Sequence, residues 1–160
     1  MKNKAFLILL LFSACKGLNS TEKNLDHQKI VSQIEQSIDQ WHQAAADADF
    51  KTYFDLMTPD AVFVGTDASE VWSKKNFMAF AKPYFEQGKA WHFKKINRHI
   101  YLDKQHPDFA WFDETLHTWM GICRGSGVIV SKNKHWRIRH YVLSITVPNT
   151  KIKQVIRVIK

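Results

Sequence analysis

The chain of 160 residues is 45% hydrophobic and carries 23 Lys and Arg against 15 Asp and Glu, a formal charge of +8. Such a length supports one hydrophobic core but not two, so we expect a single folded domain. The basic excess would suit an anionic membrane surface or an anionic ligand. No nucleic-acid-binding motif accompanies it, so nucleic acid is not an expected partner.

Residues 1–14 have the layout of an export signal. Lys2 and Lys4 precede the apolar run Ala5–Ala14, which is too short to span a bilayer. The run ends in Phe-Ser-Ala-Cys and therefore resembles a bacterial lipoprotein signal peptide, in which Cys15 becomes the acylated N-terminus. This resemblance implies a lipid-anchored protein of the bacterial cell envelope, on the periplasmic side or at the outer membrane. The alternative is an ordinary secretory signal in which Cys15 is incidental.

The region that follows shows helical periodicity. Residues 15–26 are polar and aperiodic, which predicts a tether, and Asp26 is the expected N-cap of a helix running to about Ala46. The apolar stripe of that helix consists of Ile30, Ile34, Ile38, Trp41 and Ala45.

Two shorter helices are expected next, with the short apolar strand Ala61–Gly65 between them. Asp49 is the expected cap of the first. Ser73 should open the second, and Pro83 should kink or split it near Ala81.

From Trp91 onward the hydrophobic period changes to two, which predicts strands at about 91–103, 108–120, 122–131 and 134–147. Unbroken alternation in the last strand predicts one face made of Trp136, Ile138, His140, Val142 and Ser144. The other face would be made of Arg137, Arg139, Tyr141, Leu143 and Ile145.

The second half of that second face is apolar. It predicts a homodimer through Tyr141, Leu143 and Ile145.

The glycines within Cys123–Val128 favour a β-bulge over a phosphate-binding loop, because the strand-to-helix context of such a loop is missing. Residues 151–160 interleave Ile and Val with basic residues. We expect this tail to cover the core as a terminal helix or strand.

Helices followed by a meander of strands make an α+β arrangement. Four motifs resemble the SnoaL-like branch of the nuclear transport factor 2-like superfamily. They are Trp41-His42-Gln43-Ala44, Asp60-Ala61-Val62-Phe63, Ala110-Trp111-Phe112-Asp113-Glu114 and Trp136–Ser144.

The resemblance implies a SnoaL-like domain at about residues 27–150, with the nuclear transport factor 2-like or cystatin-like fold. In this fold a cone-shaped, curved antiparallel sheet wraps around two to three N-terminal helices. Val142 departs from the pattern, because the family often has a second histidine there. Relatives include ketosteroid isomerases, polyketide cyclases, dehydratases, epoxide hydrolases and modules that only bind or assemble, so the fold alone does not give the function.

Arg98 is a charged residue in an otherwise apolar strand face, between Ile96 and Ile100. A buried guanidinium must be paired, and the neighbouring strand offers Asp113 or Glu114. We expect a buried, bidentate ion pair with one of them. Such a pair would either brace the sheet or hold a polar ligand.

Asp113 and His140 are the candidate catalytic residues. A carboxylate among rings such as Trp111 would have its pKa raised by desolvation, which suits proton abstraction next to a carbonyl. This is the chemistry of the isomerase and cyclase relatives. The alternative for His140 is a core histidine with its hydrogen bonds satisfied.

The resemblance also implies a cavity, open at one end of the cone and lined partly by aromatic rings. The ligand-binding residues expected there are Trp41, Trp72, Tyr84, Arg98, Trp111, Asp113 and His140. The sequence has no HExxH motif and no paired His or Cys spacing, so neither a metal nor another cofactor is expected.

Three functions remain open. The favoured one is a lipid-anchored domain that binds a small, largely hydrophobic molecule in the cone cavity, without demonstrated turnover. The second is an isomerase-, cyclase- or hydrolase-type enzyme using Asp113 and His140. The third is a non-catalytic dimerisation or assembly module. A raised pKa of Asp113 in an open pocket would favour the second, and a cone filled by side chains with an apolar outer sheet would favour the third.

Overall fold

The computed structural model describes residues 14–88 and 90–159, with side chains from residue 25 onward except at residue 89. The expected signal peptide lies outside the described residues apart from Ala14. Cys15 is described through its backbone only, so neither its acylation nor the cleavage before it is addressed.

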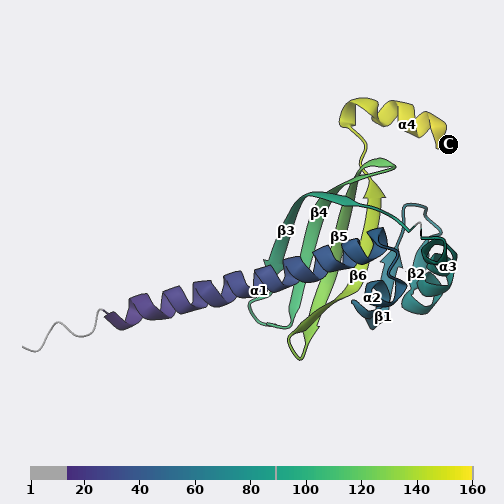
Figure 1. Cartoon of the computed structure of the whole chain (residues 1–160). Coiled ribbons are helices and arrows are strands. Elements are labelled where there is room, and N and C mark those ends of the chain that lie inside the picture. The colour runs from purple at the N-terminus through teal and green to yellow at the C-terminus, as the bar shows by residue number, and fades with distance from the viewer. Residues whose placement is uncertain (1–13, 89, 160) are drawn as a thin grey trace, which may run out of the picture.

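Ten helices and strands and one 3-10 turn follow one another along the described chain (Figure 1). Their bounds are α1 Ala14–Ala46, α2 Phe50–Asp55, β1 Met57–Val64, β2 Val71–Ser73, α3 Lys74–Glu86, β3 Lys94–Leu102, β4 Phe109–Thr118, β5 Gly121–Lys132, β6 His135–Ile145, η1 Asn149–Lys151 and α4 Ile152–Val158. The α+β class is confirmed, and the four long strands match the predicted ranges within three residues at each end.

The six strands form one curved sheet in the order β2-β1-β6-β5-β4-β3. Neighbouring strands are antiparallel except β1 and β6, which are parallel. Helices α1, α2 and α3 lie against one face, which we call the inner face (Figure 1). None of the helices that the structure describes packs against the opposite, outer face.

Helix α1 is longer than expected, because it begins at Ala14 rather than after Asp26. Gly17 is the only strong helix breaker in the polar segment, so a helix nucleated in the packed part continues through it. The packed part starts near Ile30, since residues 25–29 are exposed. Figure 1 shows the N-terminal part of α1 extending well away from the sheet.

The two predicted helix caps are confirmed. Asp49 accepts a hydrogen bond from the Thr52 backbone N at 3.0 Å, and Ser73 accepts one from the Asn76 backbone N at 3.3 Å. Helix α3 runs through Pro83 to Glu86 as one element, so of the predicted kink or split the split is wrong, and the kink stays a prediction.

The predicted alternation of β6 is wrong in its second half. Ile138 pairs with Ile129 of β5, but His140 pairs with the next residue, Val128, so Arg139 is an extra residue on β6. Such a β-bulge exchanges the two faces of the strand beyond it.

Because of the bulge, Tyr141 and Leu143 join Trp136 and Ile138 on the inner face, with 0% and 4% of their surface exposed. His140 and Val142 lie on the outer face. The predicted dimer surface of Tyr141, Leu143 and Ile145 is therefore wrong, since two of its three members are core residues.

The glycines of β5 do not mark the bulge. Gly125 and Gly127 pair in regular register with Glu114 and Phe112. Added Cβ atoms would collide with the Tyr141 hydroxyl at Gly125 and with the Phe112 ring at Gly127. These glycines therefore give space to aromatic side chains that lie over the sheet.

The C-terminal tail forms η1 and α4, but α4 has no buried residue and does not cover the core as expected. Figure 1 shows it beyond the end of β6, apart from the sheet and the other helices.

Candidate functional site

The inner face carries a cluster of ionisable groups centred on buried Glu114, which we call the Glu114 cluster. It consists of Glu35, Asp39, His42, Arg98, Glu114 and Tyr141. The side chains of Arg98 and Glu114 are both 0% exposed. The predicted burial and pairing of Arg98 are confirmed, and Glu114 is its partner on β4.

Four hydrogen-bond contacts converge on the Glu114 carboxylate. Arg98 Nε and Nη2 donate to Oε2 at 2.9 and 2.7 Å. On the other oxygen, the Tyr141 hydroxyl donates to Oε1 at 2.9 Å, and His42 Nε2 lies 2.7 Å from Oε1. A carboxylate has about four lone-pair sites, so these contacts saturate it.

The remaining donor of Arg98 faces helix α1. Its Nη1 donates to Glu35 Oε2 at 2.7 Å and to Asp39 Oδ1 at 2.8 Å. Lys95 Nζ reaches the same two carboxylates at 2.9 and 3.0 Å. The cluster thus ties α1 to β3 and β4 through one continuous network.

Burial raises the pKa of Glu114, but the hydrogen bonds and charges of His42 and Arg98 outweigh it and lower this pKa from 4.5 to about 2. Burial raises the pKa of Tyr141 well above its ordinary value, and the Glu114 charge adds to this effect. Glu114 is therefore an ionised carboxylate, and Tyr141 a neutral hydrogen-bond donor. Neither is poised to exchange protons near neutral pH, so the arrangement braces the sheet against α1.

Asp113 and His140 are not brought together. Both lie on the outer face, on β4 and β6 with β5 between them. Asp113 Oδ1 lies 3.1 Å from His99 Nδ1, and the Tyr101 hydroxyl donates to Oδ2 at 3.0 Å. The His99 contact is the main reason why the pKa of Asp113 lies below its ordinary value. The expected raised pKa in a cavity is wrong, because the face of β4 that carries Asp113 is the outer face of the sheet.

The other expected ligand residues also occupy separate places. Trp41 is 1% exposed and stacks on Tyr53 with ring centroids 4.9 Å apart. Trp72 is half-buried against Phe80, and Tyr84 is exposed on α3. Trp111 lies on the outer face. Of the seven expected residues, only Trp41 and Arg98 are largely buried on the inner side.

Aromatic side chains fill the interior of the cone. Tyr53, Phe77, Phe112 and Tyr141 are each at most 2% exposed, and Phe63 stacks on Phe77 at 4.1 Å. Two polar atoms among these rings, Trp41 Nε1 and the Tyr53 hydroxyl, are buried without a hydrogen-bond partner.

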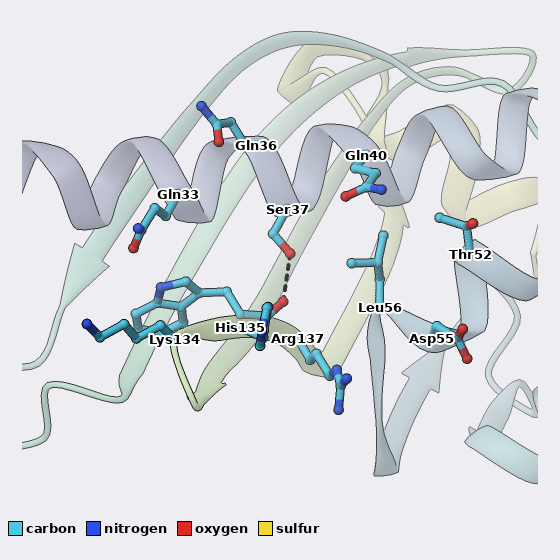
Figure 2. Close-up of a pocket in the computed structure, with 11 residues that line it drawn as sticks. Gln33, Gln36, Ser37, Gln40, Thr52, Asp55, Leu56, Lys134, His135 and Arg137 are labelled. Carbon is cyan, nitrogen blue, oxygen red and sulfur yellow. Dashed lines mark hydrogen bonds between the residues drawn. The ribbon is translucent and has the colours of Figure 1, made fainter.

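Two pockets in the described part of the chain lie outside this interior. The larger, about 450 Å³, is a polar groove between α1, α2 and the β5–β6 hairpin (Figure 2). The Ser37 hydroxyl crosses it to donate to the Trp136 carbonyl at 2.8 Å. The smaller, about 290 Å³, lies between Phe50 and Phe85. In the described part of the chain, no group of three His, Cys, Asp or Glu is placed to hold a metal.

The outer face combines apolar and polar side chains in rows across the sheet. One row, read from the strand register, consists of Val62, His140, Val128, Trp111 and Tyr101. Trp111 and Tyr101 are each 42% exposed, and their rings stack at 5.7 Å with planes 13° apart. The next row contains Val64, Val142, Ser126, Asp113 and His99.

Sequence reasoning missed Glu35, Asp39 and His42 as members of the Glu114 cluster. Their spacing of four and three residues places them along one side of α1, next to the apolar stripe, and this was an available signal. Tyr141 carried no such signal, because its inward position depends on the bulge at Arg139.

A family model described as the SnoaL-like domain matches residues 34–148. The chain belongs to the SnoaL-like domain family. No curated protein sequence matches it.

Solved structures with the NTF2-like fold resemble it at low sequence identity. An NTF2-like protein from Streptomyces avermitilis with a provisional dehydratase name is 15% identical, with a TM-score of 0.64 over 76% of this chain and 99% of that one. An NTF2-like protein of unknown function from Pseudomonas putida KT2440 is 16% identical, with a TM-score of 0.60 over 74% of this chain and 87% of that one. A provisionally named calcium/calmodulin-dependent protein kinase II association domain from Xanthomonas campestris is 22% identical, with a TM-score of 0.52 over 70% of this chain and 84% of that one.

Proposed function

We propose that this SnoaL-like domain is a non-catalytic assembly module that forms a homodimer through the outer face of its sheet. The observation that carries the proposal is the contrast between the two faces. Aromatic rings and a saturated Glu114 occupy the inner face, while the outer face is uncovered and carries the stacked Tyr101–Trp111 pair.

The outer face suits a second copy of the same chain. A two-fold interface buries the same patch on both subunits, so the patch must contain its own polar partners. The Asp113 carboxylate already contacts His99 and Tyr101 through both of its oxygens. Burial in an interface would therefore not leave this carboxylate without hydrogen-bond partners. Five adjacent strands span about 20 Å, enough for an interface on the order of 800 Å² per subunit.

The names of the similar structures do not decide between assembly and catalysis. One is an association domain and agrees with the proposal, whereas another is a provisional dehydratase. The acid–base alternative has lost its support here, because Asp113 and His140 lie apart on the outer face rather than in a cavity.

Light scattering of the Cys15→Ala chain tests the dimer without a contribution from acylation. We expect a dimer for this chain and a monomer for Trp111→Lys, because a lysine in the centre of the interface would be buried unpaired. The matched control is Tyr84→Lys, another half-exposed aromatic residue, which should leave the dimer intact. A chain that is monomeric at high micromolar concentration, or equal effects of the two substitutions, would contradict the proposal.

We also propose that acylated Cys15 holds the domain at the membrane of a bacterial cell envelope, with α1 as a spacer. The support is the Phe-Ser-Ala-Cys motif after a short apolar run and the part of α1 before Ile30, where residues 15–29 span about 22 Å. None of the described helices is long and apolar enough to cross a bilayer itself. Cys15→Ala should move the protein from the membrane to the soluble fraction, and an intact mass without acyl groups on wild-type Cys15 would reject the anchor.

A small molecule inside the cone is a second candidate function. Buried polar groups without partners cost about 1–3 kcal/mol each, and Trp41 Nε1 and the Tyr53 hydroxyl are two such groups near one another. A ligand with an acceptor for these donors would have to displace packed aromatic side chains, and it would then recover this free energy. Native mass spectrometry of the purified wild type should then show a bound molecule, and a smaller fraction of the Tyr53→Phe variant should carry it. A wild type and a variant that both show only the mass of the protein would remove this candidate.

A further inference from the structure

Helix α4 exposes an apolar stripe that nothing in the described structure covers. Ile152, Ile156 and Ile159 recur at the four- and three-residue spacing of one helix face, and they are 45%, 40% and 75% exposed. Val158, which lies away from this stripe on the helix, is 85% exposed. Lys153 and Arg157 lie on the other side of the helix. Such a short helix, apolar on one side and basic on the other, would be unstable alone in water.

The C-terminal segment that contains α4 carries charge of one sign. Residues 147–160 contain four Lys and Arg and no Asp or Glu. A partner for this end of the chain must therefore accept apolar side chains and supply negative charge.

A second exposed apolar group lies at the same end of the sheet. The turn between β4 and β5 carries Trp119, which is 83% exposed. The Thr146 backbone N, just past the end of β6, donates to the Ile122 carbonyl at 3.0 Å, so the root of the C-terminal segment and this turn are close together. Ile122 and Ile145 at this end are also 42% and 51% exposed.

We propose that α4 and the Trp119 turn together bind an anionic lipid surface. A groove on a partner protein would accommodate α4 alone. A membrane is an extended surface and can contact α4 and the Trp119 turn at the same time, because both lie at one end of the domain. Amphipathic helices with basic polar faces lie in the interface of anionic bilayers, and exposed tryptophan prefers the same region. The inference goes beyond the proposed assembly and rests neither on the dimer nor on acylation of Cys15.

The test is cosedimentation of the Cys15→Ala chain with vesicles. We expect binding to phosphatidylcholine vesicles with 30% phosphatidylglycerol and at least tenfold weaker binding to pure phosphatidylcholine vesicles. Added salt should weaken the binding because it screens the basic residues. Absence of binding to the anionic vesicles, or equal binding to both kinds, would overturn the proposal.

A matched pair of substitutions separates the apolar stripe from charge alone. Ile156→Glu and Gln154→Glu each add one negative charge to α4, but only Ile156 belongs to the stripe. We expect Ile156→Glu to weaken vesicle binding at least tenfold and Gln154→Glu less than threefold. Trp119→Ala should weaken it severalfold.

These substitutions should not disturb folding, because the residues make no buried contact, and thermal melting verifies this. Equal effects of Ile156→Glu and Gln154→Glu would overturn the proposal. So would a change of oligomeric state by Ile156→Glu with vesicle binding intact, because a second copy of the chain would then be what covers α4.

Discussion

Asp113 and Glu114 are neighbouring carboxylates on β4 that face opposite sides of the sheet. Glu114 is fully buried on the inner face, with two bonds from Arg98 and contacts from His42 and Tyr141. Asp113, on the outer face, contacts two exposed side chains. Both pKa values are lowered, but only the buried carboxylate depends on its partners to remain charged away from water. The side of the sheet, rather than the residue type, thus decides which carboxylate stabilises the fold.

The largest difference should appear when each carboxylate is neutralised. Glu114→Gln leaves the Arg98 guanidinium buried with weaker partners, and we expect it to lower the free energy of unfolding by about 3–5 kcal/mol. Asp113→Asn should cost less than about 1 kcal/mol, as for exposed pairs. Urea denaturation measures both, and similar costs for the two variants would remove the distinction between the faces.

Acid should weaken the contacts of Glu114 on the inner face. A pKa lowered in the folded state gives stability that is complete above the unfolded value near 4.5 and is lost as the pH falls toward about 2. For Glu114 this loss amounts to about 3 kcal/mol between pH 5 and 2. Glu114→Gln should lack this part of the acid sensitivity; a wild type and variant with parallel pH profiles of stability would contradict it.

Two tyrosines extend the comparison to hydroxyl groups. Tyr141 donates to buried Glu114, and Tyr101 donates to exposed Asp113, at 2.9 and 3.0 Å. Tyr141→Phe removes a hydrogen bond to a buried charge and should cost about 1.5–3 kcal/mol. Tyr101→Phe should change the stability by less than about 0.5 kcal/mol, because water replaces its hydroxyl. Equal effects of Tyr141→Phe and Tyr101→Phe in thermal denaturation would contradict the prediction, because they would show that burial does not determine how much each hydroxyl contributes to stability.

The smallest of these effects concerns space rather than charge. A methyl group at Gly125 would collide with the Tyr141 hydroxyl on the inner face. We expect Gly125→Ala to cost about 1–3 kcal/mol by overpacking. Ser126→Ala, the next residue on the outer face, should be nearly neutral. A neutral Gly125→Ala would mean that Tyr141 does not lie over β5 as described.

The sequence alone determined the class of the fold and the main elements. The 3.6-residue stripe of α1, the caps Asp49 and Ser73 and the two-residue period after Trp91 are local patterns, and local patterns need no knowledge of distant residues. The same reasoning predicted that Arg98 is buried and has an acidic partner on the next strand. It left that partner open between Asp113 and Glu114. The predicted apolar row was wrong at Ile96, because the register shifts between Lys95 and Asn97 and Ile96 is 55% exposed.

Only the tertiary structure decided which side of each strand faces inward. The extra residue Arg139 is visible only in the pairing of β6 with β5, and it reverses Tyr141 and His140 relative to simple alternation. The choice of Glu114 over Asp113 depends on α1 lying against the inner face, which brings Glu35 and Asp39 to Arg98, and His42 to Glu114, across more than fifty residues of sequence. The structure likewise shows that α4 has no buried residue. The local pattern of apolar and basic residues in α4 does not specify whether the helix packs against the core.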